Sequence, residues 1–214
     1  MGEHMKKTSK KTECALSPND FDRYQILSAD LSLRRPGFCI VKIDKINEKI
    51  QIVDVQLFSV DNKTKNKPRG EMLHENAEKL RELLALTGEP MFLVREKSIN
   101  NCNLKMRRSG SAAKSGVSET VGIADLLAWE IQKKEWDEIY PVTIKKLVTG
   151  SGKSEKTMVA KYLPAYYGQN LSFRNDDESD AAAVAIAWLI QNHQIKQIVQ
   201  EDIAHESPQT SEKI

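Results

Sequence analysis

Four carboxylates have the spacing that metal-assisted chemistry requires. Asp30 closes one apolar run and Glu96 closes another, as carboxylates at the ends of strands would. Asp177 and Asp180 are three residues apart at the start of a helical pattern, so they share one helix face. Carboxylate oxygens suit Mg²⁺ and Mn²⁺, and two such ions about 4 Å apart can clamp a phosphodiester for in-line hydrolysis. The set of four therefore indicates a two-metal nuclease site.

Taken singly, each acid has a plainer explanation. Asp30 is compatible with a turn aspartate, and acids such as Asp177 and Asp180 often cap the first turn of a helix. Asp176, directly before Asp177, leaves the register of the last pair open by one residue. The metal hypothesis depends on the four acids being brought together by the fold.

The elements that must position these acids follow from periodicity and turn residues. Three β-rich segments come first, at residues 24–29, 37–44 and 49–59, and predict an antiparallel meander. Helices and strands then alternate: helix 73–86, strand 90–94, helix 117–134, strand 139–143, helix 154–163 and helix 177–192. This order predicts an α/β protein with a mixed five-stranded sheet, three strands antiparallel and the rest parallel, flanked by helices. That is the layout of the RNase H-like fold.

Length and composition favour one such domain. The chain has 214 residues, 40% of them hydrophobic. Its longest apolar run, residues 181–190, is half of the roughly 20 residues that a membrane span needs, so no membrane association is expected. We expect a flexible basic tail with an expression scar at 1–22, a nuclease domain at 23–198 and a disordered tail at 199–214. The three scattered cysteines and the lack of a signal sequence predict a cytoplasmic protein, in a bacterial cell or a phage-infected host.

The net charge is only +2, but basic residues are concentrated in two segments. Residues 95–114 hold six basic residues and one acid, and residues 142–161 hold five lysines and one acid. Such segments bind phosphate backbones, although solvated loops have similar composition. The sequence Gly150-Ser151-Gly152-Lys153-Ser154 ends like a P-loop, but Leu147 stands where the first glycine is required, so no nucleotide cofactor is predicted.

Four segments resemble, in order, the motifs of RuvC-like Holliday junction resolvases. Residues 26–38 resemble the opening motif around the first aspartate, and residues 92–99 resemble the strand that ends in the second acid. Residues 148–159 resemble a glycine-rich turn that enters a helix with a phosphate-contacting lysine, and residues 177–187 resemble the closing Asp-x-x-Asp helix. Together they cover about residues 25–192, most of the chain, and a phage-type member fits its small size.

The resemblance implies roles for individual residues. Asp30, Glu96, Asp177 and Asp180 would be catalytic and would hold two Mg²⁺ (or Mn²⁺) ions, and Lys156 would be a catalytic lysine. Leu31-Ser32 replaces the usual Pro-Gly pair, and Ile99 stands where the family often has an aromatic wedge. The positions expected to contact DNA are Arg34, Arg35, Lys97, Ile99, Lys105, Arg107, Arg108, Lys114, Lys153 and Lys156.

The sequence therefore predicts a metal-dependent, structure-specific endonuclease that resolves Holliday junctions by paired nicks through two-metal hydrolysis. Helix 117–134, with Trp129, is a candidate homodimer interface, or else it simply covers the sheet. Three alternatives stay open: a nuclease for flaps, forks or RNA–DNA hybrids, a non-catalytic DNA-binding scaffold on the same fold, and an integrase core. The chain has little room for the extra targeting domain that the integrase needs.

Overall fold

A computed structural model describes residues 16–62, 66–98, 111–168 and 171–198. A single 3₁₀ turn (η1, Pro18–Asp20) precedes the first strand. The strands are β1 (Arg23–Asp30), β2 (Gly37–Ile46), β3 (Lys49–Ser59), β4 (Met91–Glu96) and β5 (Asp137–Ile139). The helices are α1 (Arg69–Leu84), α2 (Ser111–Gln132), α3 (Pro141–Thr149), α4 (Lys156–Tyr167) and α5 (Asp176–Gln191).

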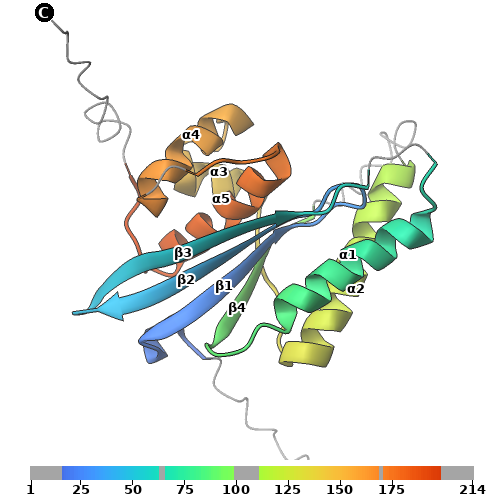
Figure 1. Ribbon diagram of the computed structural model, residues 1–214. Helices are drawn as coiled ribbons and strands as arrows, with labels where there is room; N and C mark the ends of the chain where they lie inside the picture. The colour runs from blue at the N-terminus through green and yellow to red at the C-terminus, as the bar shows by residue number, and fades with distance from the viewer. Residues whose placement is uncertain (1–15, 63–65, 99–110, 169–170, 199–214) are drawn as a thin grey trace, which may run out of the picture.

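The five strands form one mixed sheet in the order β3-β2-β1-β4-β5 (Figure 1). The first three strands are antiparallel, and β4 and β5 run parallel to β1, as the sequence predicts. Ala29 of β1 pairs with Arg95 of β4, so Asp30 and Glu96 end their strands at the same edge of the sheet. On the other side of β1, Asp30 pairs with Gly37, the first residue of β2.

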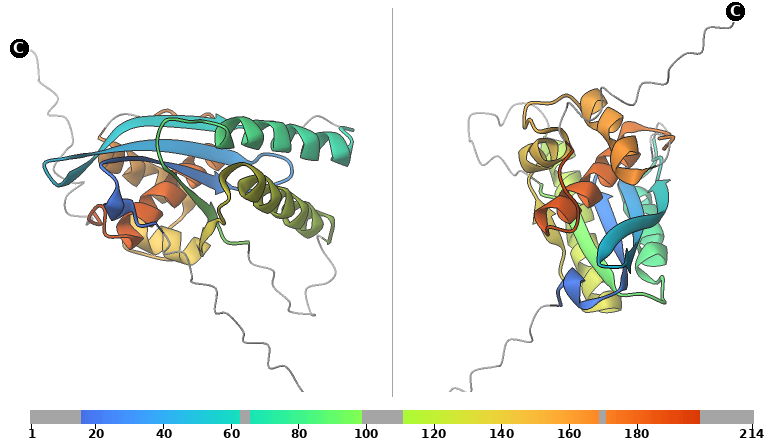
Figure 2. Two further views of the ribbon diagram at one scale, coloured as in Figure 1. Left: turned by 90° about the horizontal axis from the view of Figure 1, so that it is seen from below. Right: turned by 90° about the vertical axis from the view of Figure 1, so that its left-hand side faces the viewer.

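Helices cover both faces of the sheet: α3, α4 and α5 lie on one face, and α1 and α2 on the other (Figures 1 and 2). Successive residues of β1 alternate between the two cores, as a pleated strand requires. Ile26 packs with the α5 side and Leu27 with the α1 and α2 side, and both side chains are fully buried.

The helix that carries the last acids lies closely against the sheet. Residues 181–183 of α5 are all alanines and are buried, and small side chains let a helix approach its neighbour. Two side chains bond to its backbone: Ser28 Oγ donates to the Ala181 carbonyl (2.8 Å), and Tyr167 OH donates to the Ala182 carbonyl (2.8 Å). The apolar character of α5 thus serves burial. Of the helices in the described ranges, none is long and apolar enough to cross a bilayer.

Several predicted boundaries are wrong: α1 begins at Arg69 instead of residue 73, and α4 ends at Tyr167 instead of residue 163. The predicted strand 139–143 ends at Ile139, because Pro141 begins helix α3 with Tyr140 as its N-cap. Helix α2 begins at Ser111, six residues before the predicted start at residue 117. The β-branched residues of α3 favour a strand in isolation, but its apolar residues recur at helical spacing, and Ile144 and Val148 are buried.

Candidate active site

Three of the four predicted acids share one cavity at the carboxyl end of the central strands. Asp30, Glu96 and Asp180 line a hollow of about 180 Å³ together with Lys145 and Lys156. Two acids come from parallel strands and one from the start of α5, so the sheet and one helix suffice to bring them together. The sequence predicts that four acids lie together, and three of them line this cavity.

A close backbone contact sets the start of α5 over the sheet. A Cβ atom placed on Gly37 would lie 1.9 Å from the carbonyl oxygen of Asp177, so only glycine fits there. Asn175 caps the helix, its Oδ1 accepting a hydrogen bond from the Glu178 amide (3.0 Å). Because Gly37 pairs with Asp30, this contact fixes the first acid relative to the last two.

The shared cavity makes the negative charges of its acids costly. The pKa of Asp30 is raised from 3.8 to about 7, first by burial and then by the negative charges of Glu96 and Asp180, while Lys156 lowers it and Asp177 adds a smaller increase. Burial and then Asp180 raise the pKa of Glu96. The pKa of Asp180 is also raised, first by burial and then by Asp177 and Asp176, against the lowering effect of Lys156. A site with this excess of negative charge favours a bound cation.

The helix acids already have cationic partners in the protein. Lys156, the first residue of α4, forms an ion pair with Asp180. Burial alone would lower the pKa of Lys156, but this ion pair raises it above its ordinary value. Arg35 Nε lies 3.1 Å from Asp177 Oδ2, although that buried oxygen accepts no well-directed hydrogen bond within the described part of the chain. Asp177 therefore turns toward Arg35 and is not among the side chains that line the cavity.

The donor set suits a divalent metal ion even though it is not a preformed cage. Among residues 16–62, 66–98, 111–168 and 171–198, no three His, Cys, Asp or Glu side chains are grouped tightly enough to hold an ion. Carboxylate oxygens in excess charge are nevertheless the ligands that Mg²⁺ and Mn²⁺ prefer. Asp30, Glu96 and Asp180 fit such an ion, provided that Lys156 gives up its contact with Asp180.

Few of the predicted DNA contacts meet at the cavity. Lys156 lines it, and Arg35 pairs with Asp177 beside it. Lys97 instead pairs with Glu138 (3.1 Å) and lies over the Tyr140 ring, while Arg34 and Lys153 are exposed. The remaining predicted contacts lie outside the described residues or, for Lys114, have an undescribed side chain; they are Ile99, Lys105, Arg107, Arg108 and Lys114.

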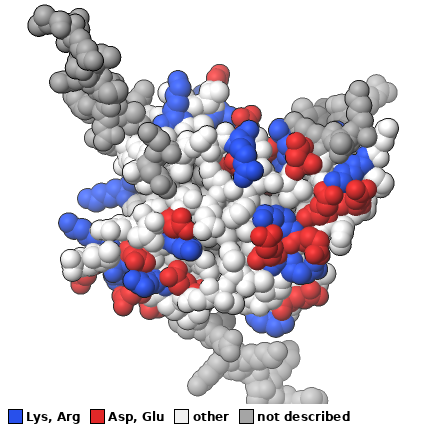
Figure 3. Space-filling view, in the orientation of Figure 1, with Lys and Arg blue, Asp and Glu red and all other residues white. Residues whose placement is uncertain are grey.

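Charge elsewhere on the molecule is mixed. On the face drawn in Figure 3, acidic and basic side chains alternate instead of forming one basic patch. Part of this pattern comes from α1, whose Lys79 pairs with Glu82 (3.0 Å) and whose Arg81 pairs with Glu78. Exposed pairs of this kind balance one another and contribute little to stability. This face therefore gives no support for a DNA-binding surface.

Comparison with known proteins identifies the family. A family model described as "Crossover junction endodeoxyribonuclease RuvC" matches residues 26–188. The chain belongs to the RuvC family. Two curated RuvC proteins are similar to it over most of their lengths. That of Wolbachia sp. subsp. Brugia malayi (strain TRS) is 28% identical over 162 residues, which cover 76% of this chain and 91% of the relative. That of Alkaliphilus metalliredigens (strain QYMF) is 27% identical over 168 residues, covering 78% and 94%.

Solved RuvC structures share the fold. Thermus thermophilus RuvC superposes with a TM-score of 0.59 at 18% identity, covering 81% of this chain and 99% of that one. The same protein in complex with a Holliday junction substrate gives a TM-score of 0.61 at 16% identity, covering 82% and 99%. The predicted RNase H-like sheet and the predicted resemblance to RuvC are therefore confirmed.

Three residues at the RuvC-like site escape sequence reasoning. Lys145 lines the cavity, but in sequence it is only one lysine of a basic segment, and its helix α3 is not predicted. Arg35 is expected to contact DNA and instead faces Asp177. Glu178 looks like one more acid of the cluster, yet it is fully buried and structural: it accepts hydrogen bonds from Ser59 Oγ (2.9 Å) and from the Arg174 amide (2.9 Å).

Proposed function

We propose that this RuvC-family protein is a metal-dependent endonuclease that resolves four-way DNA junctions by paired nicks. The observation that carries the proposal is the cavity in which Asp30, Glu96 and Asp180 converge with Lys145 and Lys156. Its lining combines oxygen ligands for a divalent ion with two lysines suited to a phosphodiester. The bacterial relatives and the T. thermophilus complex with a Holliday junction substrate support this substrate and a cytoplasmic location.

RuvC-family enzymes depend on divalent metal ions, and the finer assignment here is two Mg²⁺ or Mn²⁺ ions per site. Asp30, Glu96 and Asp180 would hold them, with Asp177 as the fourth ligand once Arg35 turns away. Bound ions supply an activated water and stabilise the leaving oxygen. The protein's own part is to bring these carboxylates together in a small cavity, where burial raises their pKa values and a bound cation would favour their ionised forms.

Lys156 and Lys145 have a different part in this scheme. Lys156 balances the charge of Asp180 in the free protein. If cations were bound by the acids, the ammonium group of Lys156 would be free to contact a DNA phosphate. Lys145, on α3, also lines the cavity, where it partly offsets the raised pKa of Glu96. Both lysines thus favour an anionic substrate that enters between α3 and α4.

The substrate has two equivalent strands to cut, which favours a two-fold dimer. We propose that α2 forms its interface. Leu126 and Trp129 lie on its outer face, and each is 56% exposed although both are large and apolar. Replacing both with serine should convert a dimer into a monomer in light scattering, and the cutting of the two strands should lose its pairing. An unchanged dimer mass would contradict this interface.

The decisive experiment uses a labelled four-way junction and a duplex of matched sequence, with Mg²⁺ or with EDTA. We expect symmetric nicks in the junction only, abolished by EDTA and by Asp30→Asn, while junction binding persists. Equal cutting of flaps and forks would indicate a broader branched-DNA nuclease, and cutting of RNA–DNA hybrids would indicate a different substrate class. Junction binding without cleavage in Mg²⁺ and in Mn²⁺ alike would contradict the proposal.

A further inference from the structure

A buried arginine lies directly beside Glu96, on the opposite face of the sheet. Arg95 precedes Glu96 in β4, and neighbouring strand residues point to opposite faces. Its side chain is only 8% exposed, and Leu93, two residues earlier on the same face, belongs to the apolar core under α1 and α2. An apolar residue would fit the pattern at this position, so the guanidinium needs an explanation.

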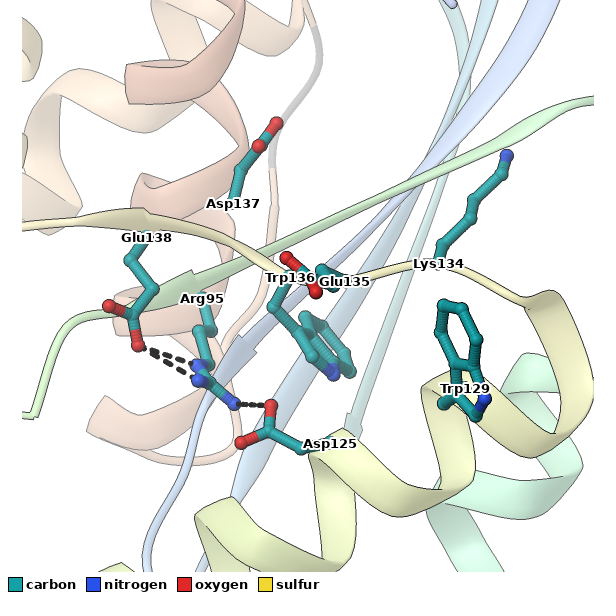
Figure 4. Close-up of a pocket in the computed structure, with 8 residues that line it drawn as sticks. All are labelled: Arg95, Asp125, Trp129, Lys134, Glu135, Trp136, Asp137 and Glu138. Atoms are coloured by element: carbon teal, nitrogen blue, oxygen red, sulfur yellow. Dashed lines mark hydrogen bonds and ion pairs between the residues drawn. The ribbon is translucent and has the colours of Figure 1, made fainter. Parts of the chain in front are cut away.

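The guanidinium of Arg95 joins three elements (Figure 4). Its Nη1 donates to Asp125 Oδ1 on α2 (2.6 Å), and its Nε and Nη2 both donate to Glu138 Oε1 on β5 (3.1 and 2.8 Å). Figure 4 shows the group lying between these two carboxylates, at the side of a hollow of about 620 Å³ that Trp129 also lines. The guanidinium is buried, whereas the side chains of Asp125 and Glu138 are 52% and 30% exposed, so these pairs add little net stability; some such pairs fix one geometry instead.

The end of β4 has little else to hold it on this side. Only three residue pairs join β4 to β5, and Glu96 with Ile139 is the last of them. Beyond it, the Lys97 amide donates to the Ile139 carbonyl (2.8 Å). Because α3 begins two residues after Ile139 and carries Lys145 to the cavity, the register of β5 also sets that wall of the site.

We propose that Arg95 is a positioning residue that fixes the carboxylate of Glu96 for metal binding by clamping β4 against α2 and β5. The inference rests on the proposed role of Glu96 as a metal ligand. Arg95 itself touches neither metal nor DNA in this scheme. It acts through the strand end, so its loss should weaken metal binding and leave DNA binding and folding largely intact.

The test compares variants that break the ion pairs of Arg95 with a variant that breaks an ion pair elsewhere in the protein. Arg95→Met removes the contacts with both Asp125 and Glu138 and has a similar side-chain volume. Arg95→Lys keeps the positive charge but loses the forked geometry of the guanidinium. Asp125→Asn removes only the ion pair with α2. Arg69→Met is the control, since Arg69 pairs with Glu119 and joins α1 to α2 away from the cavity. Each protein is measured for its thermal unfolding midpoint, its junction affinity in EDTA, its Mn²⁺ affinity by calorimetry without DNA, and the Mg²⁺ concentration that half-saturates single-turnover cleavage.

We expect Arg95→Met to raise the half-saturating Mg²⁺ concentration and the Mn²⁺ dissociation constant by about tenfold, the usual scale for residues that orient a metal ligand. Arg95→Lys and Asp125→Asn should give smaller shifts in the same direction. Junction affinity in EDTA should stay within about twofold of the parent for every variant, and Arg69→Met should match the parent throughout.

Unchanged metal affinities in folded Arg95→Met, or equal shifts in Arg69→Met, would overturn the positioning role. If Arg95→Met does not fold, Arg95→Lys and Asp125→Asn decide the question by the same measurements. Glu96→Gln tests the proposed metal role of Glu96 separately from the positioning role of Arg95. If Glu96→Gln still cleaves the junction, Glu96 is not a required metal ligand, and Arg95 has no ligand to position. If Glu96→Gln is inactive while Arg95→Met behaves like the parent, only the positioning role of Arg95 is contradicted.

Discussion

Asp30 and Glu96 stand at the ends of neighbouring strands, whereas Asp177 and Asp180 stand in the first turns of α5, and the two pairs differ in what balances their charge. Lys156 pairs with Asp180 and Arg35 with Asp177. Within the described residues, no ion pair involves either strand acid. The strand acids therefore have no direct ion-pair partner to compete with a bound cation, whereas the helix acids would become available as ligands only when their partners move.

Neutralising the acids one at a time should reduce cleavage more for the two strand acids than for the two helix acids. Asp30→Asn and Glu96→Gln should lower single-turnover junction cleavage by about a thousandfold or more, as loss of central catalytic groups does. Asp180→Asn should be nearly as severe, and Asp177→Asn should cost least because Asp177 does not line the cavity. Exposed Asp176 provides the control, and Asp176→Asn should cleave like the parent. A larger loss for Asp176→Asn than for Asp177→Asn would shift the helix register by one residue.

Replacing the basic side chain that pairs with each helix acid tests whether that side chain competes with the metal ion. Lys156→Met should lower the cleavage rate at saturating Mg²⁺ by about a hundredfold, the scale of one lost electrostatic contact to the reacting group. The same variant should need less Mg²⁺ for half-saturation, because Asp180 no longer has a competing partner. Arg35→Met should change the rate less. A Mg²⁺ requirement that rises in Lys156→Met would show that the lysine does not compete with the metal.

The contact between Gly37 and Asp177 should determine how well the two pairs fit together. Gly37→Ala forces the start of α5 away from β2, because the new Cβ would clash with the Asp177 carbonyl. We expect a loss of about 1–3 kcal/mol in the free energy of unfolding by urea, with reduced cleavage in the protein that remains folded. Gly70→Ala, in open space on α1, is the matched control and should be neutral or slightly stabilising.

The last expected effect is a gain in stability, comparable in size to the loss expected for Gly37→Ala. Because the pKa of Asp30 is raised to about 7 in the folded protein, the ionised group opposes folding at any pH above its ordinary value of 3.8. In EDTA, Asp30→Asn should be more stable than the parent by roughly 1–3 kcal/mol at neutral pH. The gain should grow as the pH rises from about 4 to about 7 and then level off. A variant less stable than the parent at pH 8 would contradict the electrostatic account.

The strand acids and Lys156 could be predicted from sequence, whereas the pairing of Arg35 with Asp177 and the place of Lys145 in the cavity could not. Asp30 and Glu96 close apolar runs, and parallel strands bring such ends together by rule. Arg35 and Lys145 depend on details that periodicity does not encode, namely a loop conformation and a helix, α3, that its β-branched residues disguise. Arg95 escapes for a third reason: a charged residue in a strand pattern is expected to be exposed, and only its two carboxylate partners make burial acceptable.

The hydrogen bond from Ser28 to Ala181 spans 153 positions of the chain, and the close contact of Gly37 with Asp177 joins segments almost as distant. The carboxylates that we propose as catalytic therefore come from segments near the two ends of the domain's sequence. During synthesis, a ribosome must release the whole domain, including α5, before the last acids can reach the first. Incomplete chains lack Asp177 and Asp180 altogether, so a truncated product of this protein carries no assembled centre with which to nick DNA.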